Sequence, residues 1–148
     1  MENNVMTVKI DLVIINRGFN SQNGELISYA KMASENKKVS ILAQSNIDLA
    51  KELKNEGRGE EIKIDTCRSY SNSASNILSR IADSIFFMVW VLTKLSQIKP
   101  VKIYIATDPP IVVPFMVAIY SRLTGAQFFY HIQDIHPEIY NLLYPLNP

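Results

Sequence analysis

The segment Lys9-Ile10-Asp11-Leu12-Val13-Ile14-Ile15-Asn16 decides the fold. It is a short run rich in β-branched residues, and its uninterrupted apolar part, Leu12 to Ile15, is typical of a strand buried on both faces of a parallel sheet. The residues that follow, 24–35, carry apolar side chains at helical spacing. These are Leu26, Ile27, Tyr29, Ala30 and Ala33. The chain therefore begins with a strand and then a helix.

The same alternation continues along the chain. Further strands are predicted over residues 38–44, 61–67, 102–106 and 127–132, and further helices over residues 47–55, 71–97, 111–124 and 138–143. Pro114 falls in the first turn of its helix, where proline is tolerated, and Gly125 ends that helix. Strands that alternate with helices through short connections form right-handed βαβ units. We therefore expect one α/β domain over residues 1–148, a doubly wound parallel sheet in a Rossmann-like three-layer arrangement.

Composition narrows the class of protein. With 148 residues, 47% hydrophobic and 20% charged, the chain resembles an ordinary globular domain. Its formal net charge of +1 gives no broad cationic field, so nucleic acid is not expected as a partner. The single cysteine, Cys67, excludes an intrachain disulfide framework and suits a reducing compartment. The first residues, Met1-Glu2-Asn3-Asn4, do not form a secretory signal, and a cytoplasmic location is expected.

Two apolar stretches bear on membrane contact. The runs at residues 85–92 and 111–120 are both much shorter than the about 20 residues of a spanning helix, so neither is predicted to cross a bilayer. The long helix is nevertheless apolar nearly all round. Its predicted core stripe is Leu78, Ile81, Ile85, Val89 and Leu92, and its predicted polar side holds Arg80, Asp83, Ser84 and Lys94. Phe87, Trp90 and Val91 fall on or beside that polar side, which predicts contact with a membrane, a partner or a second copy unless the patch is simply buried.

Ligands of such sheets bind beyond the carboxyl ends of the strands, so the loops at residues 17–25, 107–110 and 133–138 are the candidate site. In the first loop, the spacing of Gly18 and Gly24 matches neither the dinucleotide fingerprint nor the P-loop. Gly24 would let a ligand approach the backbone, or the loop is a plain turn capped by Asn23. In the second loop, Pro109 and Pro110 form a rigid lip, with Asp108 or Thr107 as an alternative helix cap.

The third loop carries the densest cluster of polar side chains. Acid, base and ligand chemistry meet in Tyr130-His131-Ile132-Gln133-Asp134-Ile135-His136-Pro137-Glu138. Asp134 is the best candidate for a base or a hydroxyl-binding group, with a turn cap as the alternative. His131 is interpreted as a core histidine. The spacing of the histidines and Asp134 lacks a standard metal-ligand pattern, so no metal is expected.

Four of these segments together resemble the N-terminal domain of glycosyltransferase family four, retaining enzymes with two facing Rossmann-like domains (the GT-B fold). They are the loop into Gly24-Glu25, Leu42-Ala43-Gln44-Ser45, Ala106-Thr107-Asp108-Pro109-Pro110, and Tyr130 to Glu138, of which the last is the most specific. The resemblance covers nearly all of residues 8–148. It is closest to the bacterial surface-polysaccharide branch, such as the O-antigen fucosaminyltransferases.

The resemblance implies transfer of a hexosyl or N-acetylamino sugar from a nucleotide diphosphosugar to a glycan or polyprenyl-linked acceptor, in O-antigen or capsule synthesis. It implies no cofactor and no catalytic metal, and a cytoplasmic protein with peripheral contact at the inner membrane. Asp134 would be catalytic, and Gly24 and Glu25 would lie near the donor diphosphate. The residues implied in acceptor binding are Asp108, Pro110, His131 and Glu138. Many relatives have histidine directly before the matching aspartate, where this chain has Gln133.

The family's C-terminal domain, which holds the donor nucleotide and a paired-glutamate motif, is absent from the sequence. Because transfer needs both substrates held in register between two domains, the chain alone is expected to be inactive. It would be a truncated form, a natural fragment, or one subunit of a split transferase. The alternative is a noncatalytic doubly wound binding or scaffold module. A nucleotide-binding domain of an oxidoreductase is disfavoured by the missing glycine fingerprint.

Overall fold

The computed structural model describes residues 10–17, 37–55, 62–71, 75–105 and 111–131, together with residues 28, 30, 31 and 33–35. Within this part of the chain, five parallel strands form one sheet in the order β3-β2-β1-β4-β5. The strands are β1 (Leu12–Arg17), β2 (Val39–Gln44), β3 (Lys63–Cys67), β4 (Lys102–Ile105) and β5 (Gln127–Tyr130). The predicted α/β parallel sheet is confirmed, with shifts only at the strand ends.

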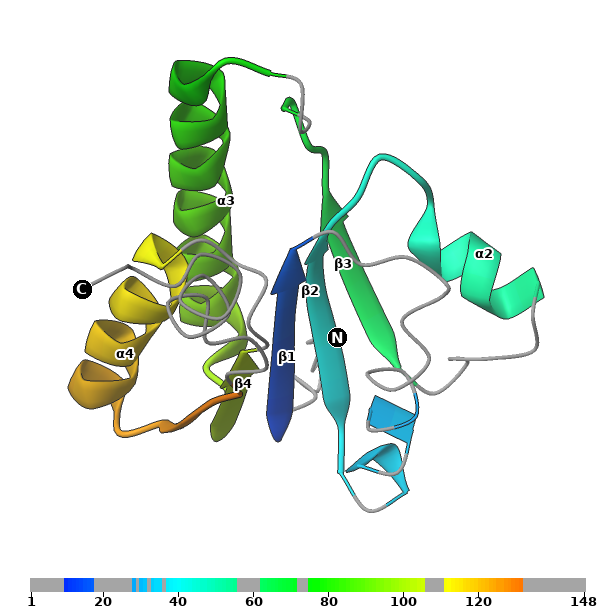
Figure 1. Cartoon of the computed structure of the whole chain (residues 1–148). Helices are drawn as coiled ribbons and strands as arrows, with labels where there is room; N and C mark the ends of the chain where they lie inside the picture. Colours follow the sequence, from blue (N-terminus) through cyan, green and yellow to red (C-terminus); the bar gives the residue numbers. More distant parts are fainter. Residues whose placement is uncertain are drawn as a thin grey trace, which may run out of the picture.

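Helices cover both faces of the sheet, as Figure 1 shows. The helices are α2 (Leu49–Asn55), α3 (Ile77–Ile98) and α4 (Val112–Thr124), and residues 28, 30, 31, 33 and 34 are also helical. α3 and α4 pack on one face, whereas α2 and Ala30 pack on the other. The fold therefore has the three layers that alternating strands and helices predict.

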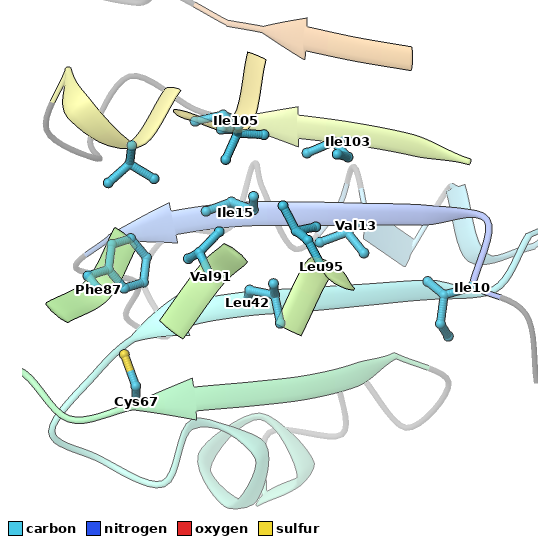
Figure 2. Packing of buried hydrophobic residues seen from close by; sticks show 12 residues of the cluster. Ile10, Val13, Ile15, Leu42, Cys67, Phe87, Val91, Leu95, Ile103 and Ile105 are labelled. Carbon is cyan, nitrogen blue, oxygen red and sulfur yellow. The ribbon is translucent and has the colours of Figure 1, made fainter. Parts of the chain in front are cut away.

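The central strand β1 divides two hydrophobic cores. Val13 and Ile15 point into the core beneath α3 and α4, which Figure 2 shows, whereas Leu12 and Ile14 point into the core beneath α2. All four side chains are buried, as expected for a strand covered on both faces. Burying apolar surface on both sides at about 25 cal/mol per Å² makes this strand a main source of stability.

The ends of α3 and α4 are set by identifiable residues. The Asn76 side chain accepts a hydrogen bond from the backbone N–H of Ser79 at 2.8 Å and caps the start of α3. Gly125 has φ of 77° and ends α4 in the left-handed conformation, as its position in the sequence predicts. Lys99 ends α3 in the same region with φ of 49°, although it carries a side chain. Pro114 lies in the first turn of α4.

The buried face of α3 is the reverse of the one predicted. Phe87 and Val91 are fully buried with Leu95 and point at the sheet (Figure 2), and Trp90 packs partly against the same core. The alternative of simple burial is therefore confirmed for Phe87 and Val91, which form no membrane or partner surface, whereas Trp90 is half-buried. The predicted core stripe faces outward instead: Leu78, Ile81, Ile85 and Val89 are exposed and Leu92 is half-buried. Because α3 is apolar on both faces, helical periodicity alone could not choose between them.

Candidate functional site

A buried ionic network joins the carboxyl ends of three strands to α3. Arg17, Gln44 and Cys67 are the last residues of β1, β2 and β3, and the strand register places them side by side. Asp83, in the second turn of α3, lies over this row with its side chain fully buried. In a parallel sheet the carboxyl ends of all strands lie on the same side. The network therefore lies beyond the carboxyl ends of the strands, where α/β proteins bind ligands.

The Asp83 carboxylate is saturated with hydrogen bonds. Its Oδ1 accepts from Gln44 Nε2 at 2.9 Å and from the Tyr70 backbone N–H at 3.1 Å. Its Oδ2 accepts from Ser71 Oγ at 2.8 Å, from Ser69 Oγ at 3.1 Å and from Arg17 Nη2 at 2.9 Å. A buried charge is tolerated only when it is paired and hydrogen-bonded in this way. Residues 69–71, which follow β3 closely, are thus held to the helix by one side chain.

The Arg17 guanidinium is fixed by the same network. Its Nε donates to Gln44 Oε1 at 2.8 Å, and its Nη1 donates to Ser84 Oγ at 3.1 Å. Its Nη2 donates to Ser71 Oγ at 3.4 Å as well as to Asp83. Arginine has five N–H donors, so one N–H on Nη1 has no partner among the described residues. The Arg17 side chain is 22% exposed, which leaves it accessible to a ligand.

The network sets the ionisation of two groups. Burial disfavours the Asp83 carboxylate, but the hydrogen bonds from Ser71, Tyr70, Ser69 and Arg17 outweigh burial and hold its pKa below the usual value of 3.8. Asp83 is therefore an anion near neutral pH. Burial, together with the negative charge of Asp83, raises the pKa of the Cys67 thiol to about 11. Because its thiol stays protonated near neutral pH, Cys67 is a poor nucleophile. It is buried and serves as part of the core.

A cavity of about 520 Å³ opens beside the network. Its cationic and hydroxyl groups come from Arg17, Arg80 and Ser84, and its apolar walls come from Ile77, Ile81, Ile85 and Val112. These residues belong to the end of β1, the first turns of α3 and the start of α4. In the strand order, β1 and β4 are the neighbours between which the chain changes direction, so the cavity lies at the switch point of the sheet.

The chemistry of the cavity suits an anion attached to an apolar body. Arg80 offers an exposed guanidinium with paired N–H donors, and Arg17 adds the one N–H on Nη1 that the network leaves; both groups can donate to the oxygens of a phosphate. Asp83 does not line the cavity, but its hydrogen bond from Arg17 fixes the position of the Arg17 guanidinium. No group of three or more histidine, cysteine, aspartate or glutamate side chains in the described ranges could hold a metal ion.

Among the residues predicted for catalysis and for donor or acceptor binding, only His131 lies in the described part of the chain. Its side chain is exposed, so the interpretation as a core histidine is wrong. Its backbone N–H donates to the Ile105 carbonyl at 2.8 Å, and its ring Nδ1 shares a 2.5 Å hydrogen bond with the Tyr104 hydroxyl. His131 immediately follows β5, the edge strand of the sheet, and an edge strand is covered less well than a central one. Its role in acceptor binding stays a prediction.

The other predicted site residues lie outside the described residues. They are Gly24, Glu25, Asp108, Pro110, Asp134 and Glu138. β4 and β5 end at Ile105 and Tyr130, directly before the segments that contain Asp108 and Asp134.

The sequence reasoning missed the residues that form the network. Helical periodicity predicts that Asp83 and Ser84 lie on a polar outer side of α3, but both are buried. Two features of the sequence indicate such an ion pair. They are Arg17 at the end of an apolar strand and Asp83 within a long apolar helix. Each is costly to bury alone, and together they neutralise each other.

Comparison with known proteins gives no family. No protein-family model matches the chain, and no curated protein matches it. Among solved structures, the ferredoxin-NADP⁺ reductase from Plasmodium falciparum with 2'P-AMP is similar at a TM-score of 0.38 and 16% identity. The similarity covers 89% of this chain and 56% of the reductase chain. Similarity at this level supports neither a shared family nor a shared reaction.

Proposed function

We propose that this chain is the acceptor-side half of a retaining glycosyltransferase that takes a sugar from a nucleotide diphosphosugar to a glycan or lipid-linked acceptor. The observation that carries the proposal is the cavity at the sheet's switch point, lined by Arg17 and Arg80. In doubly wound sheets the switch point is the general place for ligands. Arg80 gives this one a positive charge, and Arg17, whose own charge is offset by Asp83, adds a hydrogen-bond donor for a phosphate-bearing substrate.

The resemblance to glycosyltransferase family four supports the same assignment. Two of the four segments that carry the resemblance lie at strand ends: one starts directly after β4, and the other starts at Tyr130, the last residue of β5. Gln44, in a third segment, is part of the ionic network. A ligand with its phosphate at Arg17 and Arg80 would have its remainder beside the apolar walls of the cavity. The donor sugar and its nucleotide would be held by a second domain, as in the two-domain enzymes that the chain resembles.

Binding to the 148-residue chain tests the proposal. In calorimetry, we expect a short-chain polyprenyl diphosphate sugar to bind more tightly than a nucleotide diphosphosugar. Arg80→Gln should weaken that binding at least tenfold, because a guanidinium paired with phosphate is worth more than about 1.4 kcal/mol. Arg80 is exposed, so this change should leave thermal unfolding unaltered. Lys51→Gln on α2 removes an exposed charge from the other side of the sheet and is the matched control.

Two outcomes would overturn the proposal. One is the absence of saturable binding to either compound. The other is preferential binding of NADP⁺, which would indicate an oxidoreductase domain.

Asp134 is proposed as the catalytic residue of the same reaction. In an enzyme with both domains, Asp134→Asn should cut turnover sharply and leave thermal unfolding nearly unchanged, whereas a large loss of stability would identify a structural cap.

A further inference from the structure

A tyrosine and a histidine meet at the carboxyl ends of β4 and β5. Tyr104 belongs to β4, and His131 immediately follows β5, the neighbouring strand. The Tyr104 hydroxyl lies 2.5 Å from Nδ1 of His131, and the two ring centroids are 5.9 Å apart. The His131 backbone N–H also donates to the Ile105 carbonyl at 2.8 Å. The imidazole is therefore fixed both through its own backbone and by a phenol hydroxyl.

The chemistry of the two groups sets the direction of this hydrogen bond. A neutral imidazole has one nitrogen that accepts and one that donates, whereas a phenol can do either. A phenol O–H is more acidic than an imidazole N–H, and an imidazole nitrogen is more basic than a phenol oxygen. Donation from Tyr104 to Nδ1 is therefore the stronger arrangement. An accepting Nδ1 leaves the ring proton on Nε2, so the contact favours the Nε2–H tautomer of His131.

Aromatic surface lies beside the pair. Phe129 of β5 is the register partner of Tyr104, so the two side chains leave the same face of the sheet. Tyr104 packs against the core beneath α2, whereas Phe129 on the edge strand is 49% exposed. Ligand sites combine apolar or aromatic surface with a few fixed polar groups. This combination suits a sugar ring, whose C–H face packs on an aromatic ring while its oxygens accept hydrogen bonds.

The pair lies close to the cavity at the switch point. β1 and β5 are the two neighbours of β4, so two strand spacings, or roughly 10 Å, separate the backbones of Arg17 and His131. The two side chains leave opposite faces of the sheet, and a ligand that crosses the carboxyl ends of the strands contacts both. A sugar joined to a diphosphate spans such a distance. With its diphosphate at Arg17 and Arg80, an acceptor would have its sugar beside His131.

We propose that Tyr104 is a positioning residue that holds His131 as the Nε2–H tautomer, so that His131 donates a hydrogen bond to an oxygen of the acceptor sugar. In this form Nδ1 accepts from the Tyr104 hydroxyl and Nε2 carries the proton. Neutral His131 therefore serves to bind the acceptor and not to remove a proton from it. The tautomer is a property of the chain alone, whereas the identity of the ligand rests on the proposed function.

Nuclear magnetic resonance of the ¹⁵N-labelled chain tests the tautomer. The sequence has two histidines, His131 and His136, and His131→Ala identifies the signals of His131 by their loss. At pH 8, where an imidazole is neutral, long-range ¹H–¹⁵N correlations distinguish a protonated ring nitrogen from an unprotonated one. We expect His131 to be protonated only on Nε2. In Tyr104→Phe, we expect the Nδ1 signal to shift and a second population, protonated on Nδ1, to appear.

Calorimetry with a short-chain polyprenyl diphosphate sugar tests the consequence for binding. Tyr104→Phe and His131→Ala should each weaken binding about threefold or more, as expected for the loss of one hydrogen bond. The double variant should bind no more weakly than His131→Ala, because Tyr104 acts through His131. Tyr120→Phe is the matched control, since it also removes a bonded phenol hydroxyl, which donates to the Leu95 carbonyl at 2.8 Å. It should lose as much thermal stability as Tyr104→Phe and leave the His131 signals and binding unchanged.

Several outcomes would overturn the inference. Protonation of His131 on Nδ1 in the wild type is one, and identical His131 signals in the wild type and Tyr104→Phe are another. Unchanged binding by His131→Ala, or additive losses in the double variant, would also overturn it. If the wild type does not bind the polyprenyl compound, the proposed function fails, whereas the His131 signals still decide whether Tyr104 holds the Nε2–H tautomer.

Discussion

Arg17 Nη2, at the end of β1, lies 2.9 Å from Oδ2 of Asp83 on α3, and this pair joins residues that are 66 positions apart in the chain. The pair connects the central strand to the helix that forms one wall of the cavity. It also fixes the guanidinium that would meet a phosphate. Stability and ligand recognition therefore depend on the same two side chains, and each dependence can be measured separately.

Asp83→Asn should destabilise the fold by about 3 kcal/mol, because breaking a buried ion pair leaves the partner's charge uncompensated. Urea unfolding measures the loss. Glu35→Gln, which neutralises an exposed acid, is the control and should change stability by less than about 0.5 kcal/mol. Equal stability of Asp83→Asn and the wild type would show that the network contributes nothing to folding.

The same carboxylate makes stability depend on pH. Because the pKa of Asp83 is lower in the folded state than its usual value of 3.8, the folded protein releases this proton more readily than the unfolded chain. Its contribution is therefore fully present above about pH 5 and is lost as pH falls through 3.8 and below. Urea unfolding at pH 7 and pH 3 should show a smaller pH dependence for Asp83→Asn than for the wild type. Identical pH dependence of the two proteins would contradict this account.

The orientation of α3 predicts that two nearby apolar residues contribute very different amounts to stability. Phe87 is fully buried and Ile85 is 48% exposed. Phe87→Ala should therefore cost about 3–5 kcal/mol, whereas Ile85→Ala should cost less than about 1 kcal/mol. Chemical denaturation of the two variants measures both losses. A larger loss of stability for Ile85→Ala than for Phe87→Ala would contradict this orientation and would support the buried face that helical periodicity predicts.

Cys67 should react slowly while the protein is folded. With its pKa raised to about 11 by burial and by the charge of Asp83, the thiol is almost entirely protonated at pH 8. Ellman's reagent should label it slowly in buffer and rapidly in a denaturing concentration of urea. Rapid labelling of the folded protein would show that the end of β3 is open.

The sheet was predictable because its signals are local. The apolar run from Leu12 to Ile15 favours a strand that is buried on both faces, and Gly125 ends its helix because glycine readily adopts the left-handed conformation. The orientation of α3 was not predictable from periodicity, because both of its faces are apolar. The polar end of the sheet decided the orientation: Arg17 and Gln44 required Asp83 to face inward, and Phe87 and Val91 followed on the same side.

The central claim is that the cavity beside Arg17 and Arg80 binds a phosphate-bearing glycan acceptor. The most direct measurement follows the arginine side-chain Nε–H resonances of the ¹⁵N-labelled chain during titration with a short-chain polyprenyl diphosphate sugar. The account predicts saturable shifts of the Arg17 and Arg80 signals, with the signals of Arg68 and Arg122 unchanged. Saturable binding that leaves Arg17 and Arg80 unshifted, or no binding at all, would contradict it.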